Sequence, residues 1–210
     1  MSSEIDHLLW GAPELEQGVE RLEAMIGAAI LPGGRHPGVG THNALFGMED
    51  RQYFEVLAPD PEQSSFTGFG RWVQALTCPR LVTWAARTDD IDGLAFKVND
   101  VGMKAGEIRS MSRLKPDGSS LSWRLMTIDD HGLGSLIPFF IQWQDQHPCD
   151  ELEPVARLLS LQLATPDPAT LLETLRILEL ESDSIGIVSS PAPSLSARLK
   201  VQQGQEILIS

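Results

Sequence analysis

Three segments of the chain repeat one order of apolar and polar positions. They read HLLWGAPELEQGVERLEAMIG, TWAARTDDIDGLAFKVNDVG and SLQLATPDPATLLETLRILEL. Each begins with an apolar run typical of a strand, passes through a turn rich in Pro, Thr or Asp, and continues with apolar residues three and four positions apart. That spacing places them on one face of a helix. Each segment is therefore predicted to form a strand followed by an amphipathic helix.

The repeat has a nearly constant length. When the helix faces are aligned, Trp10 corresponds to Ala86 and Ala86 to Leu163, so successive copies lie 76 and 77 residues apart. Further strand-like runs follow each helix. They are separated by turn signals such as KPDGS, whose Pro, Asp and Gly favour a hairpin. Each copy thus predicts the element order β-α-β-β-β.

This order predicts an α+β fold built from tandem βαβββ modules. We place the first module at residues 1–62, a linker with a short helix at 63–80, and the second module at 81–148. A third, βαβββ-like module is placed at 149–210. A chain of 210 residues is long enough to bury a sizeable core in such an array.

Charge and composition narrow the classes of partner. The net charge is −13, which disfavours a nucleic acid or an anionic membrane, because binding phosphates needs a basic surface. No apolar run approaches the roughly 18 residues of a spanning helix, and the N-terminus lacks the basic region of a secretory signal. Cys78 and Cys149 are isolated and fit neither a metal knuckle nor a disulfide framework. We therefore expect a reduced, cytoplasmic protein.

Three stretches of the first module resemble a known superfamily. The opening IDHLLWGAPELEQGVERLEAMIG and the later HPGVGTHNALFG and QYFEVLAPDP are similar to glyoxalase-like domains of the vicinal oxygen chelate superfamily, which includes glyoxalase I and extradiol dioxygenases. The resemblance covers about residues 4–148. It implies that two βαβββ modules pair, and that their curved mixed sheets form a cup around a small molecule and a metal.

The resemblance also implies a set of metal ligands. In metal-using members each module gives one ligand from its first strand and one from its last. Carried onto this chain, these positions are His7 and Glu55 in the first module and Thr83 and Gln142 in the second. A divalent metal (Zn, Mn, Ni or Fe) would bind His7 and Glu55 well and Gln142 weakly, whereas a neutral Thr hydroxyl is a poor ligand. The expected set, His7, Glu55 and Gln142, is therefore incomplete.

Side chains alternate across a strand, so the faces that carry His7, Glu55 and Gln142 are expected to look into the cup. Glu55 is also the candidate catalytic base. A second interpretation needs no metal: a buried carboxylate requires a partner, and a hydrogen-bonded pair of His7 and Glu55 would satisfy both side chains.

Four further residues are candidates for binding the ligand. Asn43 and His42 are adjacent in a strand, so only one of them can face the cup. Arg124 could bind an anionic group or could be an exposed charge on the sheet, and Trp84 could line the pocket or belong to the core. The break PGGRHPGVG before the strand of Asn43 ends in glycines that suit either a flexible lid or a plain turn.

Three functions remain open from the sequence. The first is a metal-assisted lyase, isomerase or dioxygenase, in which the metal acts as a Lewis acid. The second is a metal-free protein that binds or sequesters a small molecule. The third is a structural module whose cup is filled by its own side chains. The odd, third module could pack against the first two or pair with another subunit, which favours a homodimer.

Overall fold

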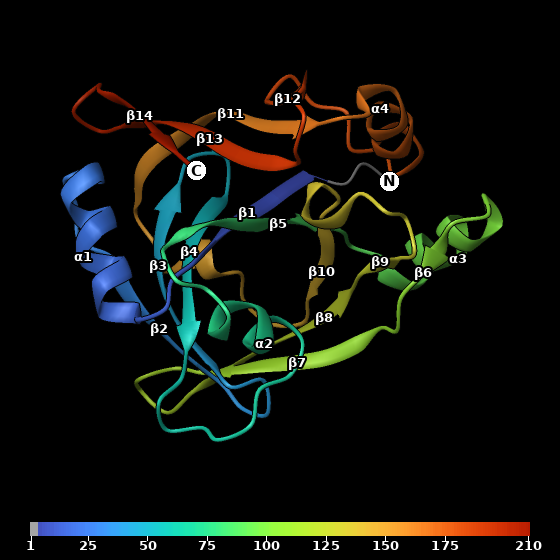
Figure 1. Ribbon diagram of the computed structural model, residues 1–210. Coiled ribbons are helices and arrows are strands. Elements are labelled where there is room, and N and C mark those ends of the chain that lie inside the picture. Colours follow the sequence, from blue (N-terminus) through green and yellow to red (C-terminus); the bar gives the residue numbers. More distant parts are fainter. Residues whose placement is uncertain (1–3) are drawn as a thin grey trace.

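Eight strands of the computed structural model, which describes residues 4–210, form a closed barrel. The order around the barrel is β4-β1-β5-β10-β8-β7-β2-β3, and β3 pairs with β4 to close it. Figure 1 looks into this barrel. The strands are β1 Glu4–Gly11, β2 Leu31–His36, β3 Thr41–Met48, β4 Gln52–Pro59, β5 Arg80–Arg87, β7 Arg109–Leu114, β8 Ser120–Met126 and β10 Phe139–Trp143. The predicted α+β fold with a curved sheet around a cup is confirmed.

The first two modules share the barrel equally and meet along two seams. In each module the first strand runs parallel to the last, as β1 does to β4 and β5 to β10. The first seam is a long antiparallel pairing of β1 with β5. The second is short: β2 and β7 pair only through Arg35 and Leu114 in their register. One sheet thus closes around a space to which both modules contribute.

Strand β2 runs through residues that the sequence indicated as a break. It continues from Leu31 to His36 and includes two glycines. A Cβ on Gly33 would lie 2.2 Å from Asn43 Oδ1, and one on Gly34 would lie 2.1 Å from the carbonyl oxygen of Leu114. The glycines therefore let the backbone lie close to its neighbours on both sides, which a composition-based turn signal does not reveal.

Helices cover the outside of the barrel. Helix α1, Leu15–Ile26, packs against β3 and β4, and α3, Ile91–Asp100, packs against β8 and β10. The side chain of Asp90 caps α3 by accepting a backbone N–H at 2.9 Å. In the linker, the short helix α2, Phe69–Gln74, lies over one end of the barrel in Figure 1.

The third module keeps the element order but not the strand order of the first two. Its elements are β11 Pro154–Thr165, α4 Pro168–Ile177, β12 Ile185–Ser189, β13 Ser194–Val201 and β14 Glu206–Ile209. The sheet order is β12-β11-β13-β14, so the first strand lies inside the sheet rather than beside the last strand. Strand β11 pairs in parallel with β3, which attaches this module to the outside of the barrel. The module boundaries stay predictions, since the modules share one continuous sheet.

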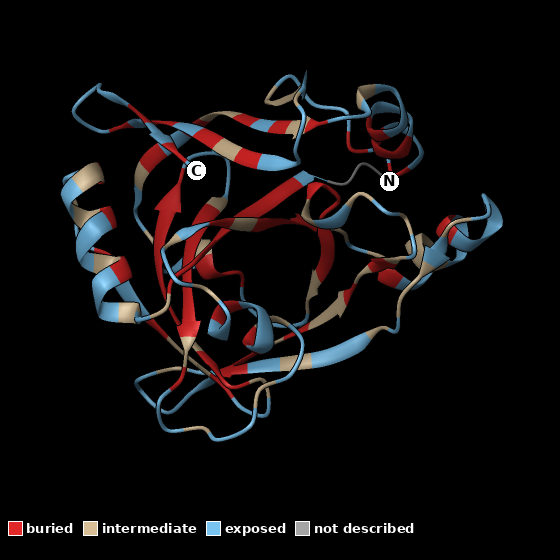
Figure 2. Cartoon of the chain, viewed as in Figure 1, coloured by how far each residue is buried: buried red, intermediate tan, exposed pale blue. Residues whose placement is uncertain are grey.

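Most of the apolar core lies outside the barrel wall, not inside it. The main cluster includes Trp10, Phe54 and Trp84 on the outward faces of their strands, together with apolar residues of the helices and of the third module. A smaller cluster, with Leu9, Leu57 and others, lies inside. Figure 2 shows buried residues along the strands that ring the barrel, while the helices keep one face exposed.

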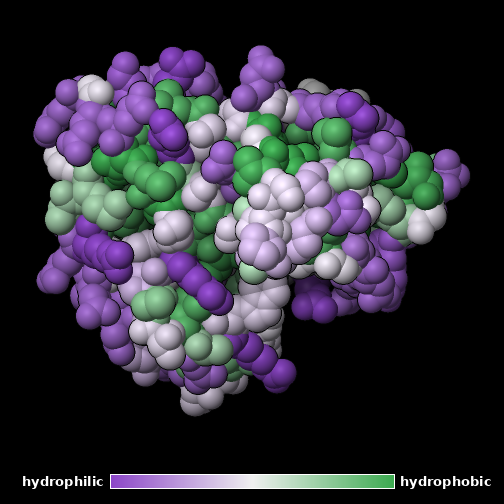
Figure 3. All heavy atoms as spheres, turned by 45° about the horizontal axis from the view of Figure 1, so that its top comes forward, coloured by the Kyte–Doolittle hydropathy of each residue, from purple (hydrophilic) through white to green (hydrophobic). Residues whose placement is uncertain are grey.

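The remaining surface is mostly hydrophilic. Figure 3, with the third module turned forward, shows apolar patches between hydrophilic side chains. Among residues 4–210, no helix has both the length and the apolar character needed to cross a membrane. The remaining short elements are β6 Lys104–Ala105, β9 Ile128–Asp129, η1 Gly134–Leu136 and η2 Pro148–Asp150.

Candidate functional site

The barrel encloses a narrow cup whose wall is mainly apolar. Its empty space, open mouth included, is about 520 Å³. Such a space suits a small molecule. The cup is lined by His7, Leu9, His36, Val39, Thr41, Asn43, Tyr53, Glu55, Leu57, Phe69, Met111, Arg113, Trp123, Leu125, Phe139, Ile141 and Trp143.

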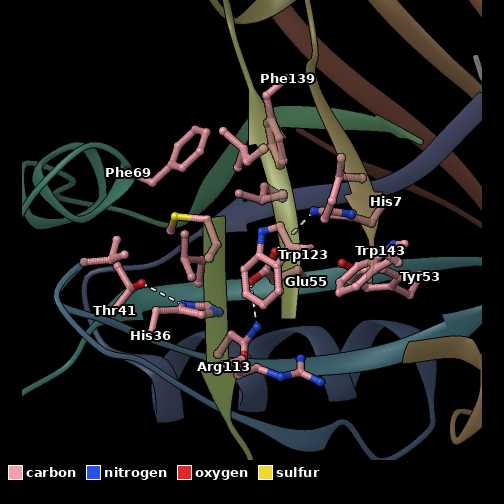
Figure 4. Close-up of a pocket in the computed structure, with 17 residues that line it drawn as sticks. His7, His36, Thr41, Tyr53, Glu55, Phe69, Arg113, Trp123, Phe139 and Trp143 are labelled. Atoms are coloured by element: carbon pink, nitrogen blue, oxygen red, sulfur yellow. Dashed lines mark hydrogen bonds and ion pairs between the residues drawn. The ribbon is translucent and has the colours of Figure 1, made fainter. Parts of the chain in front are cut away.

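Glu55 is the acidic residue of this wall. It lies in the middle of β4, where the inward side chains alternate with the outward Phe54 and Val56. One carboxylate oxygen accepts a hydrogen bond from Asn43 Nδ2 at 2.7 Å, and the other lies 3.4 Å from His7 Nε2 (Figure 4). Glu55 is 7% exposed, so these two side chains rather than bulk water are its main polar neighbours.

A second carboxylate orients His7. The Nδ1 atom of His7 lies 2.6 Å from Asp6 Oδ1. Asp6 is fully buried, and although burial by itself raises its pKa, hydrogen bonds from His147 and His7 hold that pKa below its usual value. The ionised Asp6 accepts the hydrogen of Nδ1, which leaves Nε2 as the nitrogen that faces Glu55.

Three donors converge on Asp6. Besides His7, Nε2 of His147 lies 3.0 Å away and Trp143 Nε1 donates at 3.1 Å. The other ring nitrogen of His147 accepts the backbone N–H of Cys149, so Nε2 must carry the hydrogen that is donated to Asp6. The network therefore fixes the tautomers of both histidines without a metal.

Tyr53 covers one face of His7. The two rings stack with centroids 4.3 Å apart. Burial raises the pKa of Tyr53 well above its ordinary value, so its hydroxyl stays protonated. Figure 4 shows this hydroxyl directed toward the cup, where no residue in the range 4–210 forms a hydrogen bond with it. The hydroxyl is therefore available to a bound molecule.

The opposite side of the cup carries a neutral histidine and an arginine. His36 is buried, and its Nδ1 lies 2.8 Å from Thr41 Oγ1. Burial lowers the pKa of His36 to about 4, with the positive charge of Arg113 acting in the same direction against Glu55. In Figure 4, Arg113 lies beneath the cup, away from Phe139. These residues add neutral polar groups and one positive charge to the wall.

The cup opens into a wider outer groove. The two spaces share Val39, Phe69, Met111 and Leu125, and the groove has an empty volume of about 1060 Å³. Trp72 of α2, which is 53% exposed, lines it. A molecule bound beside Glu55 could therefore extend outward past Phe69.

The structure brings together some of the residues singled out in the sequence. His7, Glu55 and Asn43 lie side by side in the cup, in agreement with strand alternation. His42 faces the other side of β3. Thr83 is buried but lines a separate hollow beyond Phe139 rather than the cup.

The other candidates lie on the outer side of the barrel. Gln142 donates to the backbone oxygen of Asp89 at 2.6 Å, near the start of α3, while its neighbours Ile141 and Trp143 face the cup. The expectation that its face of β10 looks inward is therefore not met. Arg124 forms a bidentate ion pair with Asp92 of α3.

Trp84 also lies away from the cup. It is fully buried in the main core, and its indole N–H donates to the carbonyl oxygen of Leu136 at 3.1 Å. This satisfied donor and the tight packing around the ring fit the core interpretation that the sequence left open.

Sequence reasoning missed Asp6, His36, Arg113 and His147. Strict alternation places Asp6 and His7 on opposite faces of β1, but the register of β1 against β5 shifts between Ile5 and His7. This irregularity lets two adjacent side chains meet. The adjacent Asp and His in IDHLL were a signal, but an ambiguous one.

The donor set does not fit the divalent metal that the resemblance implies. His7 Nε2 and Glu55 Oε2 are near enough to share an ion, but His7 Nδ1 is committed to Asp6 and neither Thr83 nor Gln142 reaches them. In the part of the chain from residue 4 to 210, no group of three or more His, Cys, Asp or Glu could hold a metal. Two strong ligands are fewer than such sites normally provide.

The geometry can be compared with known proteins. A sequence model of the family described as Glyoxalase-like domain matches residues 5–178. A hypothetical protein from Staphylococcus aureus, solved as a crystal structure, has a TM-score of 0.76 at 14% sequence identity and covers 99% of each chain, the third module included. No relative was found among curated proteins.

Methylmalonyl-CoA epimerases share part of the fold. A structure of a variant of the Streptomyces coelicolor enzyme in complex with 2-nitronate-propionyl-CoA has a TM-score of 0.50 at 19% identity, covering 69% of this chain and 100% of its own. The structure of the enzyme from Mycobacterium tuberculosis has a TM-score of 0.50 at 15% identity, covering 67% of this chain and 88% of its own. At these identities the likeness shows the fold alone.

Proposed function

The chain belongs to the glyoxalase-like domain family, and from this membership and the geometry of the cup we propose a metal-free role in proton transfer. In this proposal the cup binds a small organic molecule, and Glu55 and His7 move a proton to or from one of its carbon atoms. The single observation that carries the proposal is the 3.4 Å approach of His7 Nε2 to Glu55 Oε2 inside an apolar cup, with His7 oriented by Asp6.

Each residue has a defined task in this proposal. Glu55, held by Asn43, is the base that removes a proton next to a carbonyl group. Once Glu55 has taken up this proton, His7 can accept it at Nε2, because its Nδ1 hydrogen is already bound to Asp6. The free hydroxyl of Tyr53 donates to the carbonyl oxygen, where negative charge develops as the proton leaves. Isomerisation and epimerisation both need this chemistry, and the name of the epimerase neighbours is consistent with it.

The proposal is tested by proton exchange. Purified protein is incubated in D₂O with 2-oxobutanoate or 2-oxobutanamide, and loss of the C3 hydrogen signal is followed by proton NMR. We expect Glu55→Gln to reduce the exchange rate at least about a hundredfold, in line with the loss of a general base. Glu49 is an exposed carboxylate that pairs with Arg157, so Glu49→Gln is the matched control and should leave the rate unchanged. Equal exchange in wild type and Glu55→Gln would refute the role of Glu55.

A second candidate, binding or sequestration without catalysis, is favoured by one observation. The second module contributes only apolar and aromatic side chains and Arg113 to the cup. The acid–base groups beside Glu55, and Asp6 behind them, therefore all come from the first module. Under this alternative both probes bind but neither exchanges its hydrogen. The same NMR samples separate the two functions, because binding shifts the tryptophan signals of the cup whether or not exchange follows.

The predicted homodimer is kept as a proposal. Among the described strands, β14 pairs only with β13, so its other edge is open. This strand also carries the exposed Leu208. An open edge of this kind is suited to pairing with a second copy. Light scattering on the purified protein, compared with a Leu208→Lys variant, would distinguish a dimer through this edge from a monomer.

A further inference from the structure

Arg113 is a buried cation without a counter-charge. Its side chain is on the inner face of β7, and the residue is 6% exposed. Among residues 4–210, no carboxylate forms an ion pair with it, and its Nε atom is buried without any hydrogen-bond partner. Arginine keeps its charge in proteins. The fold therefore holds a largely buried positive charge that has no ion pair among the described residues.

The nearby carboxylates are already occupied. Glu55 accepts from Asn43 and lies against His7, and Asp6 accepts from three donors. Neither reaches Arg113. Arg113 lines the cup and also a second hollow that contains Glu151, but the carboxylate of Glu151 is paired with Lys115. A group that neutralises the guanidinium would therefore need to come from outside the described chain.

The position of Arg113 is fixed by its neighbours. A Cβ on Gly33 would lie 3.1 Å from an Nη atom of Arg113, and one on Gly34 would lie 3.0 Å from its Cγ. The glycine pair therefore allows the backbone of β2 to lie directly against the arginine side chain. A guanidinium held in this way loses little conformational entropy when it binds a ligand.

Along β7 the inward side chains become steadily more buried. Arg109 lies at the outer groove and is exposed, Met111 is half-buried between groove and cup, and Arg113 is buried at the cup. Arg109 is paired with Glu107 at the surface, so the cation that remains available to an anion entering through the groove is Arg113 at the end of the path. The overall charge of −13 makes this single buried positive charge more distinctive.

We propose that Arg113 binds the anionic group of the molecule that occupies the cup, and that this molecule is a small carboxylate. The inference rests on the proposed function, since it requires a ligand beside Glu55. A guanidinium matches a carboxylate in two parallel hydrogen bonds. A phosphate would be bulkier and would bring a second negative charge close to Glu55, so the narrow cup favours the carboxylate.

The test compares matched probes in the intact protein. 2-Oxobutanoate and 2-oxobutanamide have nearly the same shape but differ in charge. Binding is followed through the indole N–H signals of Trp123 and Trp143, which line the cup. We expect wild type to bind the carboxylate at least about tenfold more tightly than the amide, the magnitude of one charge-assisted hydrogen bond. Arg113→Gln should lose this preference by weakening the carboxylate only.

Two further variants make the outcome specific. Arg109→Gln removes an exposed arginine of the same strand, which pairs with Glu107, and should leave the preference in place. Arg113→Lys keeps the positive charge but lacks the planar guanidinium, so it should retain part of the preference. It replaces Arg113→Gln in the test if that variant does not fold.

The outcomes separate this inference from the proposed function. If both probes shift the tryptophan signals equally, and Arg113→Gln behaves like wild type, the role of Arg113 is refuted while binding in the cup stands. If inorganic phosphate binds through Arg113 more tightly than the carboxylate, the ligand class is wrong. If no probe shifts either signal, the proposed function fails together with this inference.

Discussion

A single buried carboxylate, Asp6, decides the chemistry of the cup. It binds Nδ1 of His7 and so turns Nε2 toward Glu55. It also receives hydrogen bonds from His147 and Trp143, which come from the end of the second module. One residue therefore connects the orientation of the acid–base pair to the packing of both modules.

Replacing Asp6 should affect stability and chemistry together. In Asp6→Asn the charge that holds His7 and His147 is lost, and one of the histidines meets an amide N–H instead of an acceptor. We expect the free energy of unfolding to fall by about 3 kcal/mol, as for breaking other buried ion pairs. Denaturant unfolding measures this change.

An exposed carboxylate provides the comparison for Asp6. Asp92 pairs with Arg124 on the surface, and Asp92→Asn should cost less than about 1 kcal/mol. The same loss in both variants would contradict the central role of Asp6.

Residue-level reasoning from the sequence expected His7 and Glu55 to look into the cup and left open whether Asn43 or His42 does; in the structure His7, Glu55 and Asn43 line it, while their roles stay proposals. This reasoning relied on alternation, which holds wherever a strand is regular. Alternation did not reveal the contact of Asp6 with His7, because the register of β1 shifts there. Such a shift depends on the strand with which β1 pairs. Arg113 was missed because an arginine in a strand is exposed in most proteins.

At the scale of elements, strand β10 shows the limit of periodicity. Apolar side chains occupy both of its faces, Phe139 and Ile141 on one and Phe140 on the other. The sequence alone could not decide which face turns inward. The choice follows from α3, because Gln142 binds the backbone at the start of that helix and must therefore point outward.

Strand β2 makes a testable contribution to the closure of the barrel. Gly34 has a φ angle of 144°, and a Cβ there would lie 2.1 Å from the carbonyl oxygen of Leu114 on β7. Gly34→Ala should therefore cost more than about 2 kcal/mol, since backbone strain and a backbone clash act together. Urea unfolding measures the loss.

The control uses another glycine with a positive φ. Gly38 has a φ of 77°, but no atom lies within 4 Å of the position of its Cβ. Gly38→Ala should cost only about 1 kcal/mol, because conformational strain remains and the clash is absent. If both variants lose the same stability, contact with β7 does not limit Gly34.

For the whole molecule, stability should depend on pH through His36. Burial lowers the pKa of the folded state to about 4, below the ordinary 6.5. As the pH falls below 6.5, His36 binds a proton in the unfolded chain but not in the folded protein, so folding becomes less favourable. The free energy of unfolding should decrease by about 3 kcal/mol between pH 6.5 and 4 from this group. Chemical unfolding at a series of pH values measures the change.

Two features separate His36 from other acid-sensitive groups. Asp6 has a lowered pKa, so its contribution is present above its ordinary value of 3.8 and is lost only below this window. His36→Gln should therefore flatten the profile between pH 6.5 and 4 and leave the loss at lower pH. An unchanged profile in His36→Gln would assign the effect to another group.

The incomplete ligand set makes a prediction about metals for the whole protein. Dialysis against EDTA should leave the melting temperature within about 1 °C, and added Zn, Mn, Ni or Fe(II) should not raise it. A site occupied at a hundred times its Kd would add about 2.7 kcal/mol and move the melting temperature by several degrees. The finding that would contradict the prediction is a stoichiometric divalent metal that disappears in His7→Asn.

The sequence by itself determined the modules, because a local apolar pattern specifies strands and helices and its recurrence at 76 and 77 residues reveals the repeat. It also determined that His7 and Glu55 lie on inward faces. Only the tertiary structure decided that the two modules close into one barrel, that the third module extends the sheet with a different strand order, that Asp6 lies behind His7 and that Arg113 lines the cup. The physical reason is that strand pairing, register and the burial of a charge depend on residues far apart in the chain, which no local pattern records.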